Sequence, residues 1–379
     1  MKKTLSILTV IFTVPALLIS CKRPYEPPAI KVDNKFLAID ATLINSADSP
    51  SVFTISRTVK LTDTTQSIYP ESGAIVSVED STGSSFPFFE REPGKYVSAP
   101  LSLNASDKYR LKIATSSGGQ YASDFINVEQ TPPIDSISWQ QQNDVFIFLN
   151  THDPSNNTVY YRWDFAETWQ YTSPLDAELS QDKGHIFYVD STNQTHTCWR
   201  TTNSTQLLTG TSVALTQNVI NKAAIATIPR NSQKISSRYS ILVKQYGLSE
   251  KAYQYFQVLK KTTENLGSIF DAQPTQLSGN IHSVSNPSEI VIGYFTASSV
   301  TQKRIFISKN EVTDWNYVYS GRECDATTIS TNPDIYLYNY PDPGFAPYYF
   351  SSSSSLFIAR KECVDCRTQG GVNQKPPYW

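Results

Sequence analysis

The stretch FLAIDATLI (Phe36–Ile44) alternates apolar with small or polar residues and is the first of seven similar short runs. A period of two is typical of a β-strand with one buried face. The other six runs are 51–58, 74–79, 85–90, 95–98, 108–115 and 121–129. Clusters of turn-forming residues separate them, at 45–50, 80–83, 92–94 and 116–119. This spacing, with no helical pattern between the runs, predicts an Ig-like antiparallel β-sandwich over residues 36–130.

The chain beyond this sandwich is predicted to form a larger β-rich domain, residues 134–379. Thr131-Pro132-Pro133 reads as a stiff linker, because proline donates no backbone hydrogen bond. Residues 159–170 alternate large aromatic with polar residues, which predicts a long strand with one buried face. Residues 171–235 are poorly patterned. Further strands are predicted at 134–139, 144–149, 185–189, 223–228, 238–245, 290–296, 303–308 and 356–361.

One helix stands out in this second domain, Glu250–Leu266. Ser249 precedes it as an N-cap, and Gly267 follows it as a stop. Its apolar residues recur mostly at steps of three and four, so the helix is expected to pack one face on a sheet.

The residues before the sandwich read as a targeting signal. Lys2 and Lys3 precede an apolar run that ends Leu18-Ile19-Ser20-Cys21, which fits a lipobox. Residues 1–20 are therefore predicted to be a lipoprotein signal peptide and Cys21 the lipidated residue. The apolar run has about fifteen residues, whereas a transmembrane helix needs ~20. The proline-rich stretch 21–35 reads as a tether to the first domain.

The composition excludes some classes of partner. The chain has 32 Lys and Arg against 34 Asp and Glu, without a basic stripe, so no nucleic-acid binding is predicted. Low charge, at 17% of residues, with many Tyr, Thr and Ser is typical of an exported β protein.

No catalytic motif is recognisable. The four histidines, at 152, 185, 196 and 282, form no His-Glu-x-x-His pair, and neither a Gly-x-Ser-x-Gly elbow nor a phosphate-binding loop occurs. We therefore predict no catalytic residue, no cofactor and no metal.

Four cysteines remain once Cys21 is set aside, and none lies in the predicted sandwich: Cys198, Cys324, Cys363 and Cys366. An even number in an oxidising compartment favours two structural disulfides. A redox pair at Cys363-x-x-Cys366 and a four-cysteine zinc site are the alternatives. Four cysteines allow three pairings, among which the sequence does not choose.

Tyrosines gather in the run 336–350, which contains three prolines and reads as a loop. They suit contact with a sugar or a protein, because an aromatic ring buries much area at low entropy cost. The alternative is that they cover the core of the second domain. The long loops of residues 171–220 are a second candidate contact surface. The candidate contact residues in the run are Tyr336, Tyr338, Tyr348 and Tyr349.

Several of these motifs together resemble a family of Bacteroidota lipoproteins, domain of unknown function 4249. The resemblance is carried by the helix and by segments in the front, middle and tail of the chain: Gly73-Ala74, Gly94–Tyr96, Tyr109–Leu111, Ser268–Pro274, Gly279–Ile281, Gly293–Phe295, Cys363–Arg367, Gly370-Gly371 and Lys375–Trp379. It implies an outer-membrane lipoprotein that is often encoded beside TonB-dependent receptors. It implies no activity and no catalytic residues.

The expected function is therefore a non-catalytic accessory or binding component of a TonB-dependent transport system. The chain would be held in the outer membrane by its N-terminal lipid. Lys22-Arg23 stands where some surface lipoproteins carry acidic residues, which leaves both the periplasmic and the cell-surface face open. The alternatives are a stand-alone carbohydrate- or peptide-binding lipoprotein and, third, a hydrolase with an unrecognised site.

Overall fold

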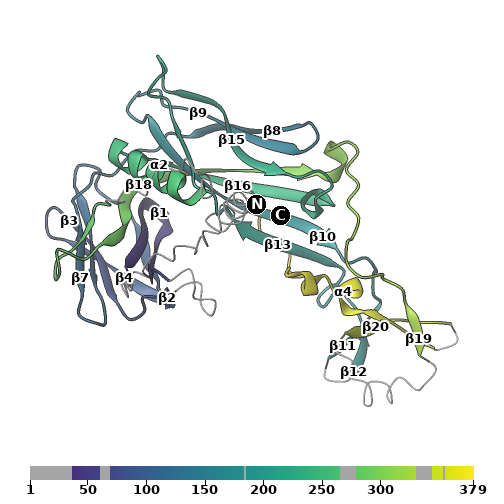
Figure 1. The fold of residues 1–379 in the computed structure, drawn as a ribbon. Helices are drawn as coiled ribbons and strands as arrows, with labels where there is room; N and C mark the ends of the chain where they lie inside the picture. Colours follow the sequence, from purple (N-terminus) through teal and green to yellow (C-terminus); the bar gives the residue numbers. More distant parts are fainter. Residues whose placement is uncertain (1–35, 60–68, 183–184, 265–278, 330–343, 353–354) are drawn as a thin grey trace, which may run out of the picture. The chain divides into compact units, whose positions relative to one another are not determined.

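The computed structural model describes residues 36–59, 69–182, 185–264, 279–329, 344–352 and 355–379, which belong to one compact unit, Phe36–Trp379 (Figure 1). The predicted signal peptide, Cys21 and the tether lie outside the described residues. The prediction of a mostly β protein with one prominent helix is confirmed.

Most strands of the predicted first domain follow the alternating runs of the sequence. The strands are β1 Leu37–Arg57, β2 Tyr69–Pro70, β3 Ile75–Asp80, β4 Ser85–Glu92, β5 Lys95–Leu101, β6 Tyr109–Ala114 and β7 Gln120–Ser123. However, β2 lies in none of the predicted runs, and β7 ends before the predicted strand 121–129 does.

The later strands include five, β11–β15, within the poorly patterned region 171–235. The strands are β8 Ile134–Gln141, β9 Val145–His152, β10 Tyr160–Thr172, β11 Leu179–Asp182, β12 His185–Tyr188, β13 Thr197–Asn203, β14 Leu208–Thr211, β15 Val219–Ile228, β16 Arg238–Gly247, β17 Ile281–Ser283, β18 Val291–Ser308, β19 Thr327–Ile329, β20 Phe345–Phe350 and β21 Leu356–Arg360. The helices are α2 Glu250–Glu264 and α4 Lys361–Val364, with 3-10 turns η1 Gln233–Ile235, η2 Lys309–Glu311 and η3 Cys366–Gln369.

One large sheet runs through both predicted domains, in the order β13-β10-β16-β18-β1-β5-β4-β3-β6-β7-β17. Strand β18 makes it continuous, because its first half pairs with β1 and its second half with β16. The β1–β18 pairing is parallel, whereas the sandwich prediction was antiparallel throughout.

Strands β1 and β18 are each longer than predicted. The predicted turn at 45–50 is instead an irregular stretch inside β1, where the strand changes partner from β18 to β5. Likewise, residues 297–302 continue β18 without a break. A strand that changes partner keeps its backbone hydrogen bonds satisfied without turning, so a local turn signal is overridden.

The first hydrophobic core lies among β1 and β3–β7 and takes in residues from much later in the chain. Phe53 is fully buried and stacks on Phe88, with ring centroids 4.1 Å apart. Phe295 of β18 meets Phe53 edge-on at 6.1 Å. Ile281 of β17 also belongs to this core. The region 36–130 therefore shares its core with residues 281–297.

The second core forms where a three-stranded sheet, β15-β9-β8, packs on the β10 and β16 part of the large sheet. Alternate residues of β9, Val145, Ile147 and Leu149, are fully buried there. They meet aromatic side chains of β10 and β16, which include Tyr161, Trp163 and Tyr239.

Helix α2 confirms the predicted helix over Glu250–Glu264, and the last two predicted residues lie outside the described part. Ala252, Tyr255 and Phe256 are buried on one face together with Leu248. Beneath them lies the buried Arg162 of β10, whose guanidinium is 5.3 Å from the Phe256 ring centroid.

A smaller C-terminal unit consists of the hairpin β11–β12, the sheet β19-β21-β20, α4 and η3. Two disulfides stabilise this unit. Cys324–Cys363 lies within it, and Cys198–Cys366 links it to β13.

Candidate functional site

An open cavity of about 520 Å³, here called the polar groove, lies among β10, β15 and the segment that joins β13 to β14. Its lining residues carry hydroxyl, amide, charged or apolar side chains. They are Phe165, Glu167, Asn203, Ser204, Thr205, Gln206, Leu208, Ala224, Ile225, Ala226, Thr227, Lys234 and Lys260.

The 203–208 wall of the groove exists because two strands share one edge of β10. Strand β13 pairs with residues 166–172 of β10, and β14 pairs with residues 160–163. The chain leaves the sheet between these pairings and returns. Ser204 holds this loop against β10 through two hydrogen bonds. Its amide donates to the Phe165 carbonyl at 2.7 Å, and its Oγ accepts from the Phe165 amide at 3.0 Å.

A paired set of charges lies at one part of the groove. Lys234 Nζ lies 2.6 Å from Glu167 Oε2, and the Tyr239 hydroxyl donates to Glu167 Oε1 at 2.7 Å. Burial, together with the charge of Glu167, holds the pKa of Tyr239 well above its ordinary value. Both oxygens of Glu167 therefore already accept hydrogen bonds from side chains of the same chain.

Strand β15 forms the opposite wall with small side chains. Ala224, Ala226 and Thr227 line the groove, and Ile225 between them is buried in the second core. The ladder to β9 is irregular here, because Ala224 pairs with Phe148 while Ala226 pairs with Ile147. Ile225 is thus the extra residue of a β-bulge, and the backbone of such a residue is left out of the ladder.

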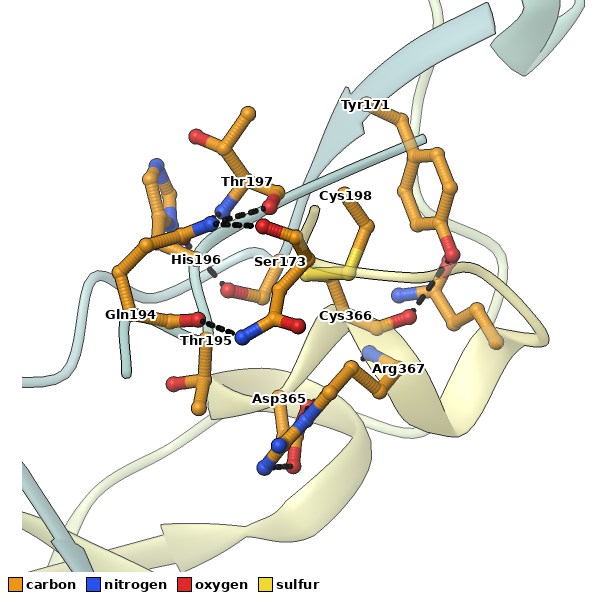
Figure 2. Close-up of a disulfide and its surroundings, with 12 residues drawn as sticks. Tyr171, Ser173, Gln194, Thr195, His196, Thr197, Cys198, Asp365, Cys366 and Arg367 are labelled. Carbon is orange, nitrogen blue, oxygen red and sulfur yellow. Dashed lines mark hydrogen bonds and ion pairs between the residues drawn. A yellow bond between two sulfur atoms is a disulfide. The ribbon is translucent and has the colours of Figure 1, made fainter. Parts of the chain in front are cut away.

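A serine, a histidine and an aspartate come together near the Cys198–Cys366 disulfide, but not as a catalytic triad. His196 Nδ1 is 3.1 Å from Ser173 Oγ and 4.0 Å from Asp176 Oδ1. A triad needs the serine and the carboxylate on different ring nitrogens. Ser173 Oγ also donates to the Leu175 carbonyl at 2.9 Å, and Ser173 is 1% exposed. The cluster therefore fits a structural role. Figure 2 shows Ser173 and His196 of this cluster near the Cys198–Cys366 disulfide.

Two other histidines lie beside single carboxylates on the surface. His152 Nδ1 is 2.8 Å from Asp135, and His282 Nε2 is 3.4 Å from Asp124. Among the described residues, no group of three or more His, Cys, Asp or Glu side chains is placed to hold a metal ion.

The cysteines pair as Cys198–Cys366 and Cys324–Cys363, with Cα atoms 5.7 and 5.5 Å apart. The disulfide prediction is confirmed. The Cys-x-x-Cys pair at 363 and 366 is split between two bridges, which leaves no thiolates for the redox or zinc alternatives. Figure 2 shows the Tyr171 hydroxyl donating to the carbonyl of Cys366, at 2.7 Å.

The candidate tyrosines divide into two pairs. Tyr336 and Tyr338 lie outside the described residues. Tyr348 and Tyr349 lie in β20, where the sequence predicted a loop, and both are half-buried. Tyr349 stacks on Phe357 of β21, with ring centroids 4.5 Å apart, and Tyr348 packs on Ala359 and Val364. Their role in partner contact stays a prediction, and the structure adds that they pack within the C-terminal unit.

A second cavity, of about 390 Å³, lies between the start of α2 and the first core. Glu129 lines it, and burial raises the pKa of this carboxyl above its ordinary value of 4.5.

The sequence did not reveal the groove residues. The predicted strand 223–228 and the candidate loops 171–220 contain most of two walls, but nothing local indicated that they face each other.

The comparisons with known proteins bear on the family. A family model described as "Domain of unknown function (DUF4249)" matches residues 22–304. The chain belongs to this family. All groove residues lie within the match, whereas Cys324, Cys363 and Cys366 lie beyond it. No curated protein matches the sequence.

Among solved structures, one described as "Biofilm associated protein - BSP domain" is 7% identical, with a TM-score of 0.14. The match covers 73% of this chain and 60% of that one. A likeness this weak carries no argument about fold or function.

The described part of the chain contains no helix that is both long enough and apolar enough to cross a membrane.

Proposed function

We propose that this DUF4249 chain is a non-catalytic binding component of a TonB-dependent transport system, anchored in the outer membrane through lipidated Cys21. The observation that carries the proposal is the polar groove. Its exposed lining residues Asn203, Thr205 and Gln206 offer amide and hydroxyl groups to a ligand. Its buried carboxylate is already paired, so the groove suits recognition of a polar molecule.

The lipobox supports the membrane half of the proposal. A lipid at Cys21 and a proline-rich tether would keep the groove near the membrane, where a receptor is also present. High local concentration makes weak contacts sufficient for assembly. The resemblance to lipoproteins encoded beside TonB-dependent receptors names the class of partner.

The membrane half is tested by fractionation and co-purification. Wild type should enter the outer-membrane fraction and co-purify with a TonB-dependent receptor after detergent solubilisation, and Cys21→Ala should move to the soluble fraction. Membrane association unchanged by Cys21→Ala would contradict lipid anchoring.

Recovery of the wild-type protein alone, even after gentle crosslinking, would contradict the transport role. It would favour the alternative of a stand-alone carbohydrate- or peptide-binding lipoprotein. Turnover of a polymer substrate by the purified chain would contradict the non-catalytic role.

A further inference from the structure

We infer that the polar groove takes an extended peptide, which adds as a strand to the outer edge of β15. This inference rests on the proposed function, because it names the ligand class of the same groove.

The first support is the position of β15. In the described residues β15 ends the sheet β15-β9-β8, with β9 on one side only. An unpaired strand edge presents backbone N–H and C=O groups, and peptide recognition commonly uses such an edge by adding a strand to it. Here the C-terminal half of that edge lines the groove.

The second support is the local form of β15. Four successive residues, 224–227, line the groove. Successive side chains of a strand point to opposite faces, so a cavity lined by all four lies along the edge of the strand. Ala224 and Ala226 have small side chains that leave this backbone accessible. The bulge at Ile225 releases further backbone groups from the β9 ladder, while the buried Ile225 side chain anchors the strand.

The third support is the wall opposite β15. Asn203, Thr205 and Gln206 are exposed there and make no side-chain hydrogen bond within the described part of the chain. Asn and Gln amides both donate and accept, which matches the alternating donors and acceptors of a peptide backbone. Phe165 and Leu208 are half-buried and offer apolar contact to one ligand side chain.

The size of the groove agrees with a short segment. Four residues of β15 span about 14 Å at ~3.4 Å per residue, enough to pair with about four residues of peptide. A volume of about 520 Å³ also lies within the usual range of ligand sites.

The experiment uses a tryptic digest of casein as the peptide probe. The purified mature chain, in wild-type form and with Ala224→Trp, is incubated with the digest, and retained peptides are identified by mass spectrometry. Ala224 is exposed, so the indole should fill the groove without entering the core. Asn221→Trp is the matched control, because Asn221 is exposed on β15 but does not line the groove.

Wild type and Asn221→Trp should retain a common set of peptides. Ala224→Trp should bind them about tenfold more weakly, or ~1.4 kcal/mol. A retained peptide is then synthesised in two forms, each with N-methyl groups on one of the two alternating sets of backbone nitrogens. Successive N–H groups of a strand point to opposite edges, so strand addition to β15 uses one set only. One methylated form should therefore lose much more binding to wild type than the other. This second measurement does not depend on how Ala224→Trp folds.

A parallel arm with an oligosaccharide panel separates the two proposals. Oligosaccharide binding that Ala224→Trp abolishes, without peptide binding, would overturn the peptide inference and keep the groove as a ligand site. If no peptide or oligosaccharide binds in a groove-dependent way, both proposals fall. Equal binding of the two methylated forms would overturn strand addition.

Discussion

The first core and the C-terminal unit are stabilised in opposite ways. In the described residues, the first core buries twenty hydrophobic residues drawn from β1, β3–β7 and later strands, and no cysteine lies among them. The C-terminal unit has two clusters of three buried residues each, Ala177, Ala359 and Val364 in one and Leu179, Leu356 and Ile358 in the other. It carries both disulfides.

The difference follows from surface-to-volume scaling. A small group of strands buries too little apolar surface to offset the entropy of ordering its chain, so small units rely on covalent cross-links. A disulfide acts mainly by restricting the unfolded chain, which makes it useful where few contacts are available. The first core, with its twenty buried residues, has no such need.

The largest change in the free energy of unfolding is expected when a buried aromatic side chain is removed from the first core. Phe53→Ala should lower the free energy of unfolding by about 4–5 kcal/mol, because the ring is fully buried and contacts both Phe88 and Phe295. Chemical denaturation measures the change. Val52→Ala is the control, since Val52 is 50% exposed and should shift stability little. Equal effects of the two changes would contradict the assigned core.

Removal of the Cys324–Cys363 disulfide should lower the free energy of unfolding by less, and only in the C-terminal unit. Cys324→Ala with Cys363→Ala opens a link that spans 39 residues and should cost about 2–4 kcal/mol in the C-terminal unit. Hydrogen exchange should rise in β20 and β21 and stay unchanged in β3 and β6. A uniform rise across both regions would show that they unfold together and would contradict separate stabilisation of the first core and the C-terminal unit.

The smallest change in the free energy of unfolding is expected for substitution of Glu129, at the edge of the first core. Burial raises the pKa of Glu129 in the folded state, so the folded chain favours the protonated carboxyl. The stability from this group is fully present below its ordinary value of 4.5 and is lost as pH rises through the raised folded pKa. Glu129→Gln should therefore be more stable than wild type at neutral pH, and the gain should disappear in acid.

Unfolding free energies measured across this pH range test the prediction for Glu129. The exposed residue Asp48, changed to Asn, is the control and should show no comparable gain. A gain at Glu129→Gln that is independent of pH would mean that burial of the charge is not its cause.

The sequence was sufficient where the signal was local. The alternating runs and their turns gave most strands of the first domain, since a half-buried strand shows its period directly. Helix α2 was also visible, because its N-cap residue Ser249 and its apolar stripe are neighbours along the chain. The lipobox and the even number of cysteines, likewise, were readable without any fold.

Tertiary structure decided what depended on distant partners. Strands β1 and β18 continue through stretches that look like breaks, because each exchanges one neighbouring strand for another. The strands within 171–235 carry polar residues at sheet edges, where burial imposes little alternation. Of three possible disulfide pairings, the folded chain selects one by bringing Cys198 to Cys366 across 168 residues.

The polar groove also depended on tertiary structure and not on local sequence signals. Its walls come from β10, residues 203–208 and β15, segments with no shared local pattern, and only the packing of the β15-β9-β8 sheet on the large sheet places them around one cavity. The sequence alone determined the mostly β class and the helix, because these follow from short-range periodicity and motifs, and on the same ground it predicts export of the chain. The site required the fold, because a cavity is a property of surfaces that meet in space and not of the order of residues along the chain.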